Sequence, residues 1–398
     1  MGLTAIATAV ALLLSGCIWN LERGEIGDIV DEFTDETFYE LPADIPAGQP
    51  GEIIRIRPVL EAPAGSRAWR VIYHSTDLAG NDIPVSGLVI VPDLPLGGDR
   101  PIVSWAHPTT GSAPACGPSL DENPFQLIEG IYDLLAAGYA VAATDYQGMS
   151  IDGPSSYLLG VTEGNNVIDA VRAAKLIPDT DIGDRVLLWG HSQGGQAALF
   201  AAQQMPDYAP ELTLEGVAVA APAADLNALM SDDIGGISGV TIAALAIPAM
   251  KVAYADRYSQ DELDAILTPD GLAAIPTVEK MCLLTQQKEI HDITGPLIGN
   301  FVTSDPATTE PWATILTENS AGASPIGVPI FLAQGLADEL VIPTANEAYV
   351  HRLCAAGEHV QFEKYEGVTH ALIAYASVPK VVLWFEKVLE GDPITSTC

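Results

Sequence analysis

Residues 185–205 read RVLLWGHSQGGQAALFAAQQM and combine an apolar run, a glycine-rich turn and a helix-forming run. The turn fits the pattern G-x-S-x-G. In a nucleophile elbow, a strand leads into a strained turn that carries the serine, and flanking glycines allow close backbone approach before a helix begins. The pentapeptide alone is weak evidence in a chain with 36 glycines, and a plain strand-to-helix turn is the alternative. Its position between RVLLW and QAALFAAQQM favours a nucleophile at Ser192.

Segments typical of strands and of helices alternate on both sides of this turn. Continuous apolar runs indicate strands that are buried on both faces, whereas a period of three to four residues indicates a helix. We expect strands within 51–60, 67–76, 82–92, 100–107, 139–146, 185–189, 214–226, 327–341 and 359–367, and helices within 127–139, 165–177, 196–205, 345–357 and 378–389. Asn165 and Asn166 are expected to cap the second helix. The alternation predicts an α/β fold with a mainly parallel sheet and helices on both faces.

Residues 223–325 interrupt this alternation. They contain helix-like apolar pieces, such as GVTIAALAIPAMKVAY, between Gly- and Pro-rich loops. An insertion of this size between two sheet strands is typical of a cap. We therefore expect a core formed by residues 51–222 and 326–398 and a helical cap (lid) formed by residues 223–325, which suits a chain of 398 residues.

The N-terminal residues predict export. Residues 3–14 are apolar but too few to span a bilayer, and they suit the apolar region of a signal peptide that covers residues 1–16. The sequence LSGC at residues 14–17 resembles the lipobox of bacterial lipoproteins, in which the mature chain begins at a diacylated cysteine. We predict that Cys17 is lipidated and anchors the protein to the cell envelope; an ordinary signal peptide and secretion are the alternative. Residues 17–50 are acidic and rich in Pro and Gly, which indicates a tether leading into the domain.

The charge of the chain excludes one class of partner. The chain has 52 acidic and 17 basic residues, a formal net charge of −35. Nucleic acid requires a basic face for its phosphates, so we expect no nucleic-acid partner. The acidic residues are expected to form a solvated surface. Cation binding is the alternative, although no acidic cluster has the spacing of a calcium loop.

Four cysteines remain besides Cys17, namely Cys116, Cys282, Cys354 and Cys398. In an exported chain, four cysteines predict two disulfides, and three pairings are open. No C-x-x-C pair or His/Cys cluster has zinc spacing, so we expect no metal. Catalysis by an activated serine needs no organic cofactor, so we expect no cofactor either.

A serine hydroxyl needs a base that takes its proton. In this architecture the three groups come along the chain in the order serine, acid, base. His370 lies in the loop between the last predicted strand and the last helix, where the carboxyl ends of parallel strands form active sites. His191 adjoins Ser192, but adjacent side chains on a tight turn point apart, so we expect His191 to pack. The remaining histidines precede the serine or lie in the insertion, inside a helix or at a strand start: His74, His107, His291, His351 and His359.

The acid is expected after the preceding strand, in IFLAQGLADELV. Asp338 fits this place, because the neighbouring Glu339 would point away from it. A solvated acidic loop is the alternative. In this arrangement the acid holds the tautomer of the imidazole.

A tetrahedral intermediate carries an oxyanion that needs preorganised N–H donors. One donor is expected from the backbone of Gln193, directly after the nucleophile. The other is expected from the loop SWAHPTTGS after an earlier strand. Pro108 has no N–H, so Thr109 is the first choice and Thr110 the second.

The chain resembles the secretory lipase family, the α/β-hydrolases typified by fungal lipase A-type enzymes and their bacterial relatives. The stretches FYELPADIPAGQPGEIIRIRPV, CGPS, DYQG, NVIDAVRAAK, GHSQGG, YAPEL and ADELVIP through VTHA come in the family's order. The resemblance implies an α/β-hydrolase fold, a triad of Ser192, Asp338 and His370, and a helical cap over an acyl-binding tunnel. It also implies the disulfides Cys116–Cys282 and Cys354–Cys398. The stretch HPTTG differs from the oxyanion segment of the fungal enzymes. Little chain follows the last helix, so a C-terminal flap over the tunnel is expected to be short or missing.

The expected function is that of a serine carboxylic-ester hydrolase, a lipase or esterase that cleaves lipid or other apolar acyl esters through an acyl-enzyme. The expected partner is a small-molecule ester or lipid, and the protein is expected to be a monomer that meets a membrane only through its lipid anchor. An acyltransferase or a peptidase could use the same triad. A surface lipoprotein that binds lipids without catalysis is the alternative from another class.

Overall fold

A computed structural model describes residues 37–95 and 98–398 of the chain. The predicted signal peptide at residues 1–16, the lipidation site at Cys17 and the tether up to residue 36 lie outside these described residues. Within the described residues, no helix is both long and apolar enough to cross a bilayer.

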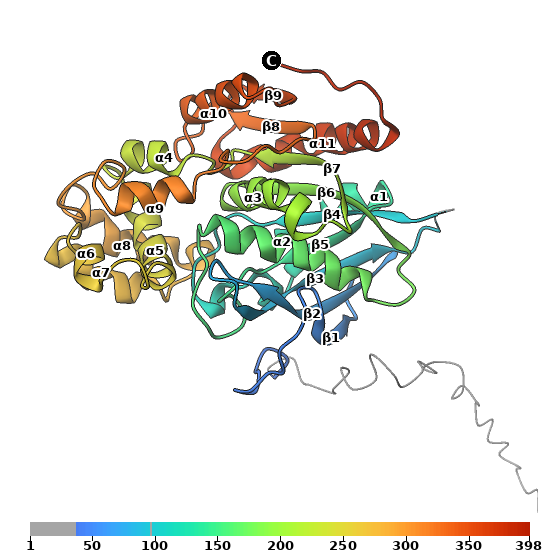
Figure 1. Cartoon of the computed structure of the whole chain (residues 1–398), viewed down its shortest axis with the longest axis horizontal. Helices are drawn as coiled ribbons and strands as arrows, with labels where there is room; N and C mark the ends of the chain where they lie inside the picture. The colour runs from blue at the N-terminus through green and yellow to red at the C-terminus, as the bar shows by residue number, and fades with distance from the viewer. Residues whose placement is uncertain (1–36, 96–97) are drawn as a thin grey trace, which may run out of the picture.

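The described residues form a nine-stranded sheet with the order β1-β2-β3-β5-β4-β6-β7-β8-β9 (Figure 1). Its strands are β1 (Ile53–Val59), β2 (Ser66–Thr76), β3 (Asp82–Pro92), β4 (Arg100–Ala106), β5 (Ala140–Thr144), β6 (Ile182–His191), β7 (Thr213–Ala220), β8 (Ile330–Gly335) and β9 (Val360–Tyr365). The pairs β1–β2, β2–β3 and β3–β5 are antiparallel, and every pair from β5 to β9 is parallel. The predicted mainly parallel sheet is therefore confirmed. β5 and β8 are buried along their whole length, as apolar runs in a doubly covered sheet require.

The helices that surround the sheet are α1 (Ile131–Ala136), α2 (Gly160–Lys175), α3 (Gln193–Tyr208), α10 (Pro343–Ala355) and α11 (Ile373–Glu390). Residues of α2, α3 and α10 share one hydrophobic core, and residues of α1 and α11 share another. Along β6, Val186 and Leu188 belong to the first core, while Leu187 and Trp189 belong to the second. Successive strand side chains point to opposite faces, so the two cores lie on the two faces of the sheet.

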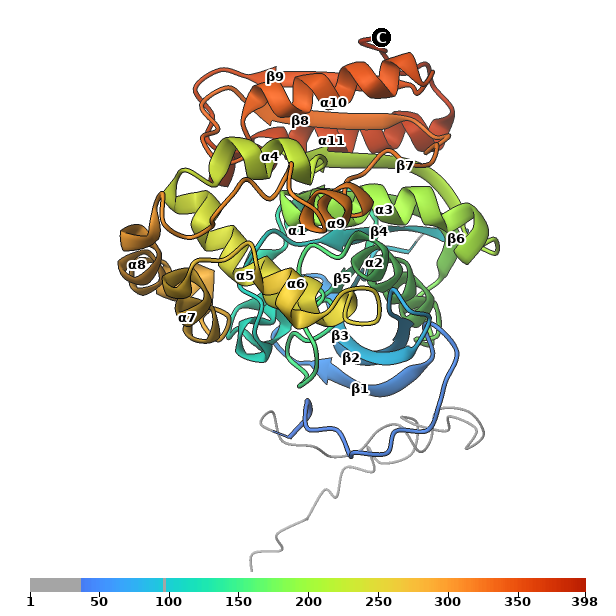
Figure 2. The same cartoon turned by 60° about the vertical axis from the view of Figure 1, so that its left-hand side comes forward.

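The segment between β7 and β8 folds into helices of its own. They are α4 (Leu226–Asp233), α5 (Ile237–Ala253), α6 (Gln260–Asp264), α7 (Pro269–Val278), α8 (Leu283–Thr294) and α9 (Trp312–Glu318). These helices lie to the left of the sheet in Figure 1, and in Figure 2, where that side is turned forward, several of them lie in front of the sheet. α5 is apolar on nearly every side and largely buried, because α4, α7 and α8 pack around it.

The start of α2 differs from the sequence prediction. The helix begins at Gly160, so Asn165 and Asn166 lie inside it and are not caps. The side-chain amide of Asn165 donates to the backbone oxygen of Thr76, and that of Asn166 donates to the Ser75 hydroxyl. Both asparagines therefore bind the end of β2, a contact between distant segments that no local cap pattern encodes.

Candidate active site

Ser192 occupies the turn between β6 and α3. Its backbone has φ 57° and ψ −118°, a left-handed conformation that is strained for a residue with a side chain. The neighbouring glycines are required by close contacts: a Cβ on Gly190 would lie 2.1 Å from the Gly194 oxygen, and one on Gly194 would lie 1.9 Å from the Ala106 oxygen. The predicted strand, turn and helix are all present, and they hold the serine at the carboxyl end of a central strand.

Two distant loops bring a histidine and an aspartate to Ser192. Asp338 follows β8, and His370 opens η5 (His370–Leu372), a short 3₁₀ turn after β9. The Nε2 atom of His370 lies 2.9 Å from the Ser192 hydroxyl oxygen. Its Nδ1 atom lies 2.8 Å from Oδ2 of Asp338. With Nδ1–H donating to the carboxylate, Nε2 is free to accept the serine proton.

The Asp338 carboxylate is held from both sides. Its Oδ1 atom accepts hydrogen bonds from the backbone N–H groups of Leu340 and Val341, at 2.9 and 2.8 Å. The side chain is buried, whereas that of Glu339 is exposed. The choice of Asp338 over Glu339 thus agrees with the geometry. A carboxylate fixed by two N–H donors keeps its second oxygen aimed at the imidazole.

Burial lowers the pKa of His370 below its ordinary value. The hydrogen bond to Asp338 opposes this effect and raises the pKa, and the nearby His191 lowers it again. The net effect is a lowered pKa, so the imidazole is neutral at neutral pH. A neutral ring can accept the proton of Ser192, which a general base requires.

Thr109, the first choice for the second oxyanion donor, lies at the cavity that Ser192 lines. Thr109 and Gln193 line the same cavity as Ser192, and Thr110 does not line it. Among the described residues, no acceptor takes a hydrogen bond from the Thr109 N–H. The Thr109 hydroxyl lies 2.8 Å from the hydroxyl of Tyr157, which holds the residue at the cavity wall. The geometry favours Thr109 over Thr110.

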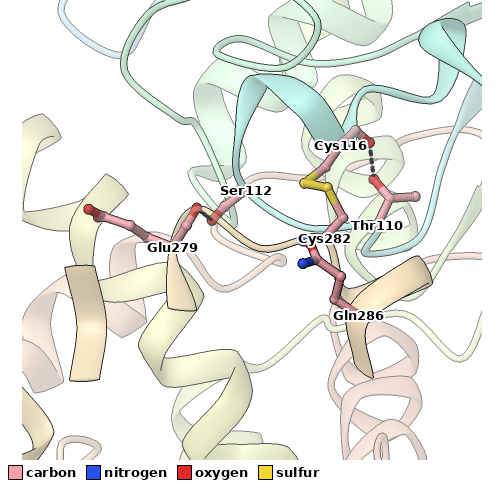
Figure 3. The surroundings of a disulfide bond; sticks show 6 residues. All are labelled: Thr110, Ser112, Cys116, Glu279, Cys282 and Gln286. Carbon is pink, nitrogen blue, oxygen red and sulfur yellow. Dashed lines mark hydrogen bonds between the residues drawn. A yellow bond between two sulfur atoms is a disulfide. The ribbon is translucent and has the colours of Figure 1, made fainter. Parts of the chain in front are cut away.

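A disulfide fastens this loop to the helices between β7 and β8. Cys116 is bonded to Cys282, the residue that precedes α8 (Figure 3). Beside the bond, the Thr110 hydroxyl donates to the Cys116 oxygen, and the Thr110 oxygen accepts from the N–H of Leu284. The hydroxyl and the backbone oxygen of Thr110 therefore serve the junction with α8, and Thr110 does not line the cavity.

The second disulfide joins Cys354, on α10, to Cys398 at the end of the chain. Both disulfides have the pairing that the family resemblance implies. No cluster of three or more His, Cys, Asp or Glu residues that could hold a metal occurs within residues 37–95 and 98–398.

Glu163 is a residue of the site that the sequence did not indicate. It lies on α2 and its side chain is fully buried. Its Oε1 atom accepts hydrogen bonds from the side-chain amide of Gln193, at 2.7 Å, and from the N–H of Leu158, at 3.2 Å. Burial raises the pKa of this carboxyl well above its ordinary value. Glu163 therefore braces the residue that follows the nucleophile, a contact across 30 residues that follows no recognisable motif.

His191 is buried, as the sequence predicted, but its ring also has polar partners. The Nδ1 atom lies 2.8 Å from Oε2 of Glu129, and the Nε2 atom lies 3.0 Å from the backbone oxygen of His370. His191 is thus not available as the base for Ser192. Glu129 is 62 residues away in the sequence, so no local pattern pairs it with His191.

An apolar cavity of about 820 Å³, including its open mouth, begins at Ser192. α5 supplies one wall with residues at helical spacing: Gly239, Ile242, Ala243, Ala246, Ile247 and Met250. α4 and α9 supply other apolar side chains, including Leu229 and Trp312. The Ser192 hydroxyl therefore lies beside a space that suits an apolar group.

Comparisons with known proteins agree with this architecture. A sequence model of the secretory lipase family matches residues 127–397. Lipase A of Arthroderma benhamiae is 24% identical over 92% of this chain and 81% of that protein. "Probable inactive lipase MT1628" of Mycobacterium tuberculosis is 26% identical over 91% of this chain and 83% of that protein.

Solved structures show the same fold. The crystal structure of Candida antarctica lipase A superposes with a TM-score of 0.75 and 21% identity, covering 92% of this chain and 88% of that chain. The rice cell wall degrading esterase LipA from Xanthomonas oryzae superposes with a TM-score of 0.70 and 17% identity, covering 87% of this chain and 100% of that chain. The family model spans more than half of the chain. The chain therefore belongs to the secretory lipase family, which places it among the carboxylic ester hydrolases of the α/β-hydrolase fold.

Proposed function

We propose that the protein hydrolyses lipid or other apolar acyl esters through an acyl-enzyme on Ser192. The observation that carries this proposal is the continuous set of contacts from Asp338 through His370 to Ser192, at the mouth of an apolar cavity. A relic site has no need to keep the acid, the base and the nucleophile within hydrogen-bond distance of one another.

The reaction proceeds in two steps. Ser192 Oγ attacks the ester carbonyl while His370 Nε2 takes the hydroxyl proton, and the carbonyl oxygen becomes an oxyanion between the N–H groups of Gln193 and Thr109. As the bond to the alcohol breaks, His370 returns the proton to the leaving oxygen. Water then attacks the acyl-enzyme, again giving a proton to His370, and the acid product leaves as Ser192 regains its hydrogen.

Labelling with a fluorophosphonate probe tests this proposal. The probe forms a covalent bond only with an activated serine, so we expect one label per chain, on Ser192, and none in the Ser192→Ala variant. Mass spectrometry of the labelled peptide gives the position. A folded wild-type protein that resists the probe would support the alternative of a surface lipoprotein that binds lipids without catalysis.

We propose that residues 223–325 form a cap that binds the acyl chain. The cavity-lining residues of α5 run from Gly239 to Met250 along one face of the helix. At 1.5 Å per residue, they span about 16 Å, the length of an acyl chain of roughly a dozen carbons. Binding along this wall would place the apolar chain on α5 and the ester carbonyl at Ser192.

Narrowing this wall is expected to shorten the accepted acyl chain. Ala246→Phe fills the cavity beside α5, so we expect the ratio of kcat/KM for p-nitrophenyl palmitate over butyrate to fall. Exclusion of about four methylenes, at about 0.8 kcal/mol each, corresponds to a loss of roughly 10²-fold. Val252→Phe is the matched control, because Val252 lies on the same helix and is 57% exposed. An unchanged ratio in Ala246→Phe would mean that the acyl chain binds elsewhere.

We further propose that the protein is exported and anchored through a lipidated Cys17. Two disulfides suit an oxidising compartment outside the cytoplasm. Of the five cysteines in the chain, four form these disulfides, and Cys17 is the fifth. Mass spectrometry of the mature N-terminal peptide tests the anchor, and an unmodified Cys17 there would contradict it.

A further inference from the structure

Glu129 and His191 form a buried pair behind the proposed triad, and the mechanism above assigns no task to either residue. His191 ends β6, and Glu129 lies shortly before α1. Their side chains are 3% and 8% exposed, so the contact between His191 Nδ1 and Glu129 Oε2 is shielded from water. Neither side chain lines the cavity. Their place in the fold therefore points to a task other than substrate binding.

The partners of His191 determine where its protons lie. The backbone oxygen of His370 can only accept a hydrogen bond, so the facing Nε2 atom of His191 carries a hydrogen. The Nδ1 atom of His191 faces the Glu129 carboxyl, so the ring joins Glu129 to the main chain of His370.

We propose that the Glu129–His191 pair positions the base His370. This inference rests on the proposed function. In the proposed state Glu129 is ionised and His191 carries a hydrogen on both ring nitrogens, so the pair anchors the main chain of His370 and places a positive charge beside the His370 ring. Both residues are positioning residues, since they act on the reaction only through His370.

The anchor acts on the short turn that carries the base. His370 begins the short turn η5, and its backbone oxygen closes that turn by accepting from the N–H of Ile373. The Nε2–H of His191 donates to the same oxygen and ties the turn to β6. Glu129 is tied to β6 a second time, because its backbone oxygen accepts from Nε1 of Trp189 at 2.8 Å. The base is thus held against the strand that carries the nucleophile.

The charge acts on the same ring. The rings of His191 and His370 have centroids 5.0 Å apart. His191 lowers the pKa of His370, whereas Asp338 and, more weakly, Glu129 raise it. Two further groups interact electrostatically with this set: Glu129 raises the pKa of the Tyr375 hydroxyl, from α11, and Asp338 raises the pKa of the Asp233 carboxyl, from α4. His191 lowers the pKa of His370 more than Glu129 raises it. The charged pair as a whole therefore keeps the His370 ring neutral down to a lower pH.

The variant Glu129→Gln separates the charge from the anchor. Its amide can donate to Nδ1 of a neutral His191, whose Nε2–H still reaches the His370 oxygen. The acid limb of the kcat/KM profile reports the pKa of the base in the free enzyme. Because removal of the pair's charge raises the pKa of His370, we expect this limb to move to higher pH, with KM for p-nitrophenyl butyrate unchanged. Glu122→Gln, at an exposed carboxylate before α1, is the control and should leave the limb in place.

The variant His191→Phe removes both the charge and the anchor. Displacement of the base predicts a fall in kcat of about 10²-fold with an unchanged KM. Thermal melting shows whether this variant folds; if it does not, Glu129→Gln decides the matter alone. Two results together would overturn the inference. Glu129→Gln would have to keep the wild-type kcat and the wild-type acid limb of the kcat/KM profile, and a folded His191→Phe would have to keep the wild-type kcat. Absence of fluorophosphonate labelling in the wild-type protein would instead overturn the proposed function, so the two failures are distinguishable.

Discussion

Replacing His370 with alanine is expected to lower kcat by about 10⁶-fold, close to the limit of detection. The Ser192 hydroxyl would lose the acceptor that now lies 2.9 Å away, and among the described residues no other base lies within reach of it. His191 cannot substitute, because its two ring nitrogens are engaged by Glu129 and by the His370 backbone oxygen. The measurement is steady-state hydrolysis of p-nitrophenyl butyrate by the purified variant.

His351→Ala is the matched control for this variant. His351 follows the serine in the sequence, as a base should, but its side chain lies exposed on α10. We expect this variant to keep wild-type kcat. A His370→Ala variant with more than a few per cent of wild-type kcat would show that another group accepts the serine proton.

Replacing Asp338 with asparagine is expected to lower kcat by about 10⁴-fold with little effect on folding. The amide oxygen would remain where Oδ1 now accepts two backbone N–H groups, so the amide nitrogen would face His370. An amide nitrogen can only donate, which forces the hydrogen of the neutral imidazole onto Nε2. The base would then present N–H to Ser192 and could not accept its proton.

Glu339→Gln tests the alternative acid with the same chemical change. Glu339 is exposed, and we expect its variant to retain full activity. Thermal melting of both variants shows whether any loss of activity comes from unfolding. Equal losses in Asp338→Asn and Glu339→Gln, or none in either, would contradict the role given to Asp338.

Much of the site could be predicted because its parts lie at the ends of strands. The motif around Ser192 is local, since the strand, the turn and the helix follow one another within about twenty residues. Asp338 and His370 could be chosen because each follows a recognisable strand and parallel strands end at the same edge of a sheet. The mainly parallel sheet itself followed from the alternation of apolar strands and helices.

The choice between Thr109 and Thr110 and the residues that support the site could not be predicted in the same way. Thr109 and Thr110 have the same chemistry, and only the structure shows that Thr109 lines the cavity while Thr110 serves the junction with α8. The residues that brace the site are held by partners far away in the sequence: Glu163 by Gln193, and Glu129 by His191. Each of these contacts depends on the direction in which a buried side chain points after the helices have packed.

The sequence by itself therefore determined the sheet, the turn that carries Ser192 and the places of Asp338 and His370 after later strands. These features depend on local periodicity and on where strands end, and both are written in neighbouring residues. The tertiary structure decided which threonine lines the cavity, that Asn165 and Asn166 bind β2 in place of capping α2, and that His191 contacts the backbone oxygen of His370. The physical reason is that a buried polar group must find a partner, and folding supplies that partner from a distant segment.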